Sequence, residues 1–272
     1  MELCFNLEYL SKDIGISQAA KTVKEAGFHL LDYTPDVTQN WRGDLEQTQS
    51  CFERNGLSVY QCHAPFNRYH QYGSAENHKK LVDESLSAAI ELSASYLVLH
   101  GDEFDFDRLV YSPKAALRFN YEYFAPVVER AEKHGVGIAF ENVFEDDMNV
   151  PRNCSKTEDL NALIEKFHCD AVCCCWDFGH GAVSYQEKQS EAIEKMGNKI
   201  RCTHVHDNYL NADLHLVPYL GKIDWESCVN ALKLGGLPEV FSFELVYGHV
   251  PATAAAEFMG FLHRIGQRLL SI

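Results

Sequence analysis

Four side chains that commonly bind divalent metals stand at or just after the ends of apolar runs of strand length. The runs are IAFEN, CCCWDFGH, CTHVHDN and VFSFELVYG, and the residues are Glu141, Asp177, His204 and Glu244. Carboxylate oxygens and an imidazole nitrogen suit a hard to borderline divalent cation. If the runs are parallel strands of one closed barrel, these side chains converge on a common point. The pattern therefore predicts a metal-dependent enzyme.

The two glutamates suggest proton transfer as well as metal binding. A carboxylate beside a divalent cation is ionised at neutral pH and can accept a proton from a substrate C–H bond. A metal that binds a carbonyl oxygen and the adjacent hydroxyl acidifies the hydrogen between them and stabilises the enediolate. Glu141 and Glu244 could then remove and return the proton. Return to the neighbouring carbon gives isomerisation, and return to the opposite face gives epimerisation.

Five more polar residues end predicted strands or follow them. They are His63, His100, His180, Asp213 and His215. A lone histidine at a strand end is usually a hydrogen-bonded structural residue. The joint placement favours a site, because a random distribution would put such residues in helices as readily as at strand ends. We expect them to bind a second metal or the substrate, with bracing of Asp177 as an alternative role for His180.

Apolar runs of strand length alternate with longer amphipathic stretches, which is typical of repeated βα units. The eight predicted strands are residues 3–7, 29–33, 58–63, 96–100, 137–142, 173–177, 201–206 and 240–245. Clear helices are predicted over 17–26, 74–93 and 113–134, and from Pro251 onward. The first strand lacks the glycine-rich turn of a doubly wound open sheet. We therefore predict an α/β fold, with residues 1–272 as a single (β/α)8 TIM barrel domain.

The composition disfavours several classes of partner and location. A net charge of -15 at pH 7 argues against nucleic acid, because such binding rests on Lys and Arg. Three of the ten cysteines are consecutive, Cys173 to Cys175, where strand geometry prevents regular pairing, so we expect reduced thiols and a cytoplasmic protein. No basic export signal and no apolar stretch of membrane-spanning length is visible. A homo-oligomer is compatible with the sequence, since exposed loops such as 64–73 could meet a second subunit.

The motifs together resemble the xylose isomerase-like barrel superfamily, which includes sugar-phosphate isomerases and epimerases, hydroxypyruvate and inosose enzymes, and the endonuclease IV apurinic endonucleases. The resemblance covers nearly the whole chain and rests on CHAPF, LHGD, FENV, WDFGH, HVHDN, DLHLVPYLGKIDW and FELVYG. It implies His204 rather than His206 as the histidine ligand, because the family's ligand histidine lies three residues before an acid, here Asp207. The metal ligands that it implies are Glu141, Asp177, His204 and Glu244.

The two branches of this superfamily demand different additional residues. The resemblance to the nuclease branch implies one zinc on His63 and His100 and another on His180, Asp213 and His215. The predicted mouth is acidic, which would repel a phosphate backbone. Its acidic residues are Asp102, Glu103, Asp105, Asp107, Glu145, Asp146 and Asp147. The ketose 3-epimerase branch usually has an arginine six residues after the ligand histidine, where this chain has Leu210.

We therefore expect a sugar or sugar-phosphate isomerase or epimerase that uses a divalent metal, Mn, Zn, Mg or Co, and no organic cofactor. Its expected partner is a small sugar-derived substrate. Phe66, Trp176 and His206 are candidates for the pocket wall, although aromatic residues beside barrel strands more often belong to the core. One alternative is an endonuclease IV-like multi-zinc phosphodiesterase. Another is a binding subunit that keeps the barrel without activity.

Overall fold

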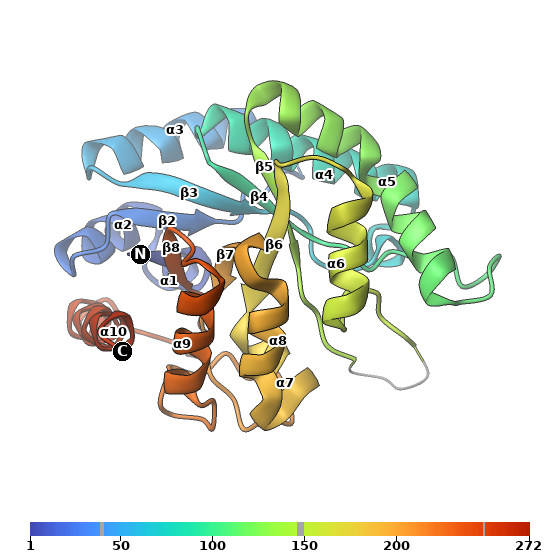
Figure 1. Ribbon diagram of the computed structural model, residues 1–272. Helices are drawn as coiled ribbons and strands as arrows, with labels where there is room; N and C mark the ends of the chain where they lie inside the picture. The colour runs from blue at the N-terminus through green and yellow to red at the C-terminus, as the bar shows by residue number, and fades with distance from the viewer. Residues whose placement is uncertain (39–40, 146–149, 247) are drawn as a thin grey trace.

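The computed structural model describes residues 1–38, 41–145, 150–246 and 248–272, and it confirms the predicted barrel. Eight parallel strands form one sheet in the order β7-β6-β5-β4-β3-β2-β1-β8. A parallel bridge between Val205 and Phe243 joins the two outer strands of that order. Helices surround the strands, and α10 packs against both α9 and α2 to complete the ring (Figure 1).

The strands agree with the predicted ones to within two residues at either end. They are β1 (Glu2–Asn6), β2 (Leu30–Tyr33), β3 (Ser58–His63), β4 (Tyr96–His100), β5 (Gly137–Glu141), β6 (Val172–Asp177), β7 (Ile200–His204) and β8 (Val240–Phe243). The seventh strand is shorter than predicted because the chain leaves the sheet after Val205. Asp207 instead forms an antiparallel bridge with Leu216 in the following loop.

Three of the predicted helices, α2, α4 and α5, begin and end within two residues of their predicted bounds. Ser112 caps α5, since its hydroxyl accepts a hydrogen bond from the Ala115 N–H, and Gly135 ends that helix in a left-handed conformation. The last helix begins at Ala255, four residues later than predicted. The helices are α1 (Glu8–Ile14), α2 (Ile16–Glu25), α3 (Trp41–Arg54), α4 (Ala75–Glu91), α5 (Pro113–His134), α6 (Thr157–Lys166), α7 (Phe178–Tyr185), α8 (Gln189–Met196), α9 (Trp225–Gly235) and α10 (Ala255–Leu270), with 3-10 turns η1 (Tyr69–Tyr72), η2 (Gln186–Lys188) and η3 (Gly197–Lys199). In the part of the chain that the structure describes, none of these helices combines the length and apolar character that crossing a bilayer requires.

Two apolar layers support the barrel. The larger one lies between strands and helices, and the smaller one fills the barrel interior. Neighbouring residues of a strand point to opposite faces, so Cys173 and Cys175 face the interior while Cys174 and Trp176 face the helices. All ten cysteines are free thiols. The strand alternation explains why the cysteine run cannot gather on one ion.

Asp102 ties together the loops that follow β3, β4 and β5. Its Oδ2 lies 3.3 Å from Arg68 Nε and 2.6 Å from Arg152 Nε, and Arg68 also donates to the Pro151 carbonyl. Burial opposes ionisation, but Arg152 and Arg68 outweigh it and hold the pKa of Asp102 below its usual value. Asp102 is therefore an internal, compensated charge. It does not form part of the repelling surface that the sequence predicted.

Glu103, the next residue, is also buried, and its carboxylate accepts hydrogen bonds from the Tyr69 N–H. Burial raises the pKa of Glu103 to about 8 despite these hydrogen bonds, and the charge of Asp102 adds to the rise. Glu103 is thus mainly protonated at neutral pH. Two of the acidic residues counted at the mouth do not present a negative surface, and Asp146 and Asp147 lie outside the described residues.

The raised pKa of Glu103 predicts a loss of stability at alkaline pH. The folded protein holds a proton that the unfolded chain releases above pH 4.5. The contribution of this proton to the free energy of unfolding is therefore complete below pH 4.5 and is lost as the pH rises through 8. We expect Glu103→Gln to reduce the decline in unfolding free energy between about pH 5.5 and about pH 8.5 by roughly 3 kcal/mol. Urea denaturation at a series of pH values measures this. Glu122→Gln, an exposed change on α5, is the control, and equal slopes for wild type and Glu103→Gln would contradict the prediction.

Candidate metal centre

The four predicted ligands meet at the carboxyl end of the barrel. Glu141, Asp177 and His204 are the last residues of β5, β6 and β7, and Glu244 directly follows β8. His204 Nδ1 lies 3.1 Å from Glu141 Oε1, 3.8 Å from Asp177 Oδ2 and 3.5 Å from Glu244 Oε2. One ligand atom from each residue falls within 4.8 Å of all the others. The structure therefore brings together four groups that are up to 103 positions apart in the sequence.

A second cluster shares Glu141. His63 Nε2 and His100 Nε2 lie 3.1 Å and 3.2 Å from Glu141 Oε2, whereas Oε1 faces His204 and, at 3.3 Å, His180 Nδ1. The two oxygens of one carboxylate thus face two separate groups of histidines. Glu141 would therefore be available as a ligand to either group if divalent ions were bound there.

A third cluster lies on the other side of Asp177. The ligand atoms of His206, Asp213 and His215 fall within 4.8 Å of one another. His215 Nε2 is 3.0 Å from Asp213 Oδ2, and the rings of His206 and His215 stack with centroids 3.9 Å apart. His180 Nε2 approaches the same Asp213 oxygen to 3.4 Å.

The structure assigns His206 differently from the sequence. The sequence predicted a pocket-wall position, but His206 is fully buried and its Nε2 lies 2.8 Å from Asp177 Oδ2. His206 lies beyond the end of β7, so the alternation of side chains along the strand does not place it, and its position depends on the loop that follows. His180 also braces Asp177, because its backbone N–H donates to Asp177 Oδ1 at 2.6 Å.

In the absence of metal, protonated histidines balance the negative charge of the carboxylates in the centre. Burial opposes the ionisation of Glu141, but His204 and His100 outweigh it and hold its pKa well below the usual value. Burial alone would lower the pKa of His204, yet Glu244 and Glu141 are among the neighbours that hold it well above its usual value. The pKa of His215 is raised to about 9 against burial, chiefly by its hydrogen bond with Asp213.

The donor set fits a divalent cation. Nδ1 of His204, Nδ1 of His206 and Oδ1 of Asp213 are buried atoms without a hydrogen-bond partner among the described residues. A metal ion binds a neutral imidazole and an ionised carboxylate, so it would replace the protons that the histidines hold. Carboxylate oxygens together with imidazole nitrogens suit a hard to borderline divalent cation.

Asp207 fixes the loop that carries Asp213 and His215, a role that the sequence did not reveal. This buried carboxylate accepts hydrogen bonds from the backbone N–H groups of Asn208, Tyr219 and Ile223 and from the indole of Trp225, at 2.8 to 3.1 Å. A Cβ atom at Gly221 would lie 2.2 Å from Asp207 Oδ1. The glycine of the PYLGKIDW motif is therefore required for close approach of the loop to this carboxylate.

A pocket of about 480 Å³ opens onto the clusters. Phe66, Phe144 and Arg68 line it together with His100, His180 and Asp213. Phe66 is 50% exposed, as a pocket wall requires. Trp176 does not line this pocket: it is fully buried between the sheet and the helices, because its neighbour Asp177 takes the opposite face of β6.

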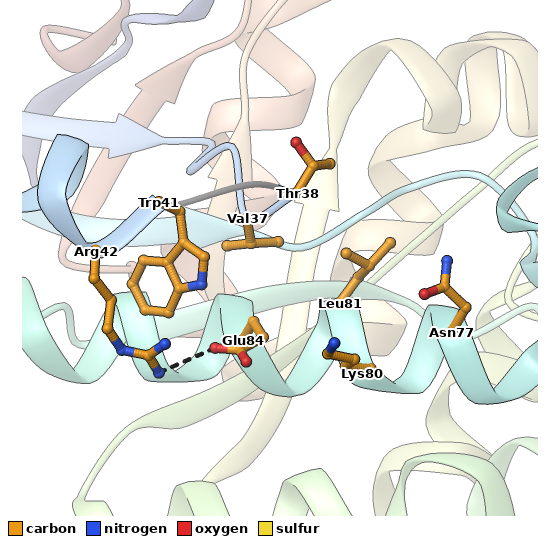
Figure 2. Close-up of a pocket in the computed structure, with 8 residues that line it drawn as sticks. All are labelled: Val37, Thr38, Trp41, Arg42, Asn77, Lys80, Leu81 and Glu84. Atoms are coloured by element: carbon orange, nitrogen blue, oxygen red, sulfur yellow. Dashed lines mark hydrogen bonds and ion pairs between the residues drawn. The ribbon is translucent and has the colours of Figure 1, made fainter.

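A separate hollow of about 330 Å³ lies outside the barrel, between the first turn of α3 and residues 77–84 of α4 (Figure 2). There the Arg42 guanidinium lies 4.2 Å from the centre of the Trp41 ring and 3.1 Å from Glu84 Oε2. The hollow contains none of the candidate ligands. We therefore look for metal binding at the mouth of the barrel and not in this hollow.

Comparison with known proteins supports this architecture. The protein y4fM of Sinorhizobium fredii, described as uncharacterized, is 25% identical over 260 residues, which cover 85% of this chain and 81% of that protein. A crystal structure of a D-tagatose 3-epimerase-like protein has a TM-score of 0.77 at 19% identity and covers 99% of this chain and 100% of its own. The IOLI protein with a bound zinc atom has a TM-score of 0.74 at 16% identity, covering 99% of this chain and 96% of that one.

The structural likenesses show a shared fold, and the match to a family model shows the family. The model described as "Xylose isomerase-like TIM barrel" matches residues 20–265, which is most of the chain. This agrees with the motifs at the strand ends and with the parallel order of the eight strands. The chain therefore belongs to the xylose isomerase-like TIM barrel family.

Proposed function

We propose that this protein is a divalent-metal-dependent isomerase or epimerase that acts on a small sugar-derived carbonyl compound. The observation that carries the proposal is the pair of carboxylates, Glu141 and Glu244, that approach His204 from different strands. A fold shared with a D-tagatose 3-epimerase-like protein supports it. A bound divalent ion would polarise the substrate carbonyl and its neighbouring hydroxyl.

The two carboxylates differ in their freedom to move a proton. The Glu141 side chain is 1% exposed and lies within 3.3 Å of four histidines, so it can accept a proton only after releasing some of them. The Glu244 side chain is 19% exposed and contacts His204 and His215 at 3.5 and 3.7 Å. We therefore assign to Glu244 the first removal of the C–H proton, and to Glu141 mainly the binding of metal, with return of the proton as its second role.

The pocket walls would orient the substrate and exclude water. Phe66 and Phe144 offer apolar surface to a sugar face, while His100 and His180 offer ring nitrogens to its hydroxyl groups. Positioning of this kind is what an enolising enzyme requires, because the C–H bond must point at the base.

A second candidate function is phosphoester hydrolysis on a cluster of three zinc ions. It is favoured by the three adjoining ligand groups and by the position of Glu141 between two of them. The neutralised Asp102 and the protonated Glu103 weaken the electrostatic objection to a phosphate substrate. Metal content distinguishes the candidates in part: one tightly bound ion per chain favours the sugar enzyme, and three zinc ions favour hydrolysis.

Hydrogen exchange in heavy water tests the proposal directly. The metal-loaded protein is incubated with a panel of ketoses and 2-oxo acids, and deuterium in the recovered compound is measured by NMR and mass spectrometry. We expect deuterium on the carbon next to the carbonyl group of at least one compound, and none with Glu244→Gln. Absence of exchange across the panel, combined with hydrolysis of bis(p-nitrophenyl) phosphate, would replace the first candidate by the second.

A further inference from the structure

A carboxylate that the proposed mechanism does not use lies inside the barrel, on the far side of His204 from the metal ligands. Asp32, on β2, is fully buried, and its Oδ2 lies 3.3 Å from His204 Nε2, an ion-pair contact at a nitrogen that forms no hydrogen bond among the described residues. The other ring nitrogen, Nδ1, faces Glu141 and Glu244. The imidazole of His204 therefore stands between one interior carboxylate and the carboxylates of the centre.

The fold aims Asp32 at this position. The pairing of β2 with β3 shifts register between Leu31 and Asp32, and the shift places Asp32 opposite Gln61. Irregularities of this kind redirect a side chain. Gln61 Nε2 then donates to Asp32 Oδ2 at 3.1 Å, and Ser242 Oγ donates from β8 at 3.5 Å. Side chains from β3 and β8 thus hold the Asp32 Oδ2 atom of β2 next to His204.

The surroundings of Asp32 contain few groups that can balance its charge. Among the described residues, the contacts of its carboxylate are the neutral Gln61 and Ser242 and the imidazole of His204. Its second oxygen, Oδ1, is buried and has no hydrogen-bond partner in the part of the chain that the structure describes. An ionised carboxylate in such a place is costly unless a cation or a polarised N–H group faces it. His204 is the group that can meet this need.

We propose that Asp32 is a positioning residue for metal binding, which keeps the proton of His204 on Nε2 and leaves Nδ1 as the ligand atom. A neutral imidazole carries its proton on one nitrogen only, so a carboxylate at Nε2 selects the tautomer. An N–H directed at a carboxylate also makes the opposite nitrogen a stronger ligand and orients the ring. The inference rests on the divalent metal of the proposed function, but it does not depend on the reaction catalysed.

The test compares zinc affinity in three forms of the full chain: wild type, Asp32→Asn and Ser242→Ala. The protein is stripped of metal and titrated with zinc in competition with a fluorescent chelator. We expect Asp32→Asn to weaken the tightest site about 10- to 100-fold. Ser242→Ala is the matched control, because it removes the longer contact to the same oxygen and leaves His204 facing the carboxylate, so its affinity should equal that of wild type.

A purely structural role for Asp32 gives a different result. In that case Asp32→Asn would lower the melting temperature of the metal-free protein and leave zinc affinity unchanged, which would overturn the inference. If the wild-type protein bound no zinc, manganese or cobalt, both the proposed function and this inference would be wrong. Equal zinc affinity in wild type and Asp32→Asn would contradict this inference and leave the proposed function standing.

Histidine tautomers in the wild-type protein provide a second measurement if Asp32→Asn does not fold. The zinc-loaded chain labelled with ¹⁵N-histidine is studied by NMR, and the His204 signals are identified by their loss in His204→Gln. We expect a proton on Nε2 and none on Nδ1. A proton on Nδ1, with Nε2 bound to the metal, would overturn the inference.

Discussion

Glu141→Gln and Glu244→Gln should each lower kcat by about 10²- to 10⁴-fold, the usual contribution of a positioned acid or base. The two variants should differ in metal binding. Glu141 contacts histidines of two clusters, so its loss should weaken metal binding in both, whereas Glu244 belongs to one cluster. Turnover measurements combined with metal analysis of the purified variants give both quantities.

Glu239→Gln provides a matched control for Glu244→Gln. Glu239 precedes β8 and Glu244 follows it, so the two changes remove the same charge at opposite ends of one strand. The control should keep full turnover. We also expect both site variants to fold, because their side chains lie at the rim rather than in the apolar layers. Loss of cooperative melting in Glu141→Gln or Glu244→Gln, with activity retained in the folded fraction, would contradict the assignment.

Removal of metal should abolish turnover and also lower stability. A ligand that binds only the folded state stabilises it by about 2.7 kcal/mol when its concentration is 100 times Kd. For a chain of this size that corresponds to a fall in Tm of about 5 to 10 °C on chelation. The physical reason is that Glu141, Asp177 and Asp213 lie close together with little access to solvent. Calorimetry with and without EDTA measures the change.

The effect of chelation should grow with pH. Protons compete with the metal for the same imidazole nitrogens, and the pKa of His215 is raised to about 9, so protons balance the carboxylates well only below that pH. Addition of zinc should restore both Tm and activity, and EDTA already saturated with zinc is the control for nonspecific effects. An unchanged Tm after complete removal of metal would show that the centre does not couple metal binding to folding.

Residues at strand ends were the most predictable part of the site. Glu141, Asp177, His204 and Glu244 follow apolar runs of recognisable length, and parallel strands in a barrel bring their ends to one rim. Side-chain direction was less predictable. The sequence offers Trp176 as a candidate for the pocket wall, but Trp176 adjoins Asp177, and adjacent strand residues face opposite sides. Its burial against the helices follows from that rule.

Groups that depend on loop paths could not be assigned from the sequence. The position of His206 beside His215 is set by the loop that Asp207 holds through four hydrogen bonds. The pairing of Asp102 with Arg68 and Arg152 joins residues from three loops. These contacts link segments distant in the chain, and no local periodicity reports them.

The sequence by itself determined the alternation of strands and helices, the family and the chemical types of the candidate ligands, because periodicity, caps and motifs are local properties. The tertiary structure decided how many clusters those candidate ligands form, which carboxylate is partly exposed and which is surrounded by histidines. It also decided that Asp32 lies beneath His204. The physical reason is that burial and pairing depend on what surrounds a side chain in space, and those neighbours come from other strands of the barrel.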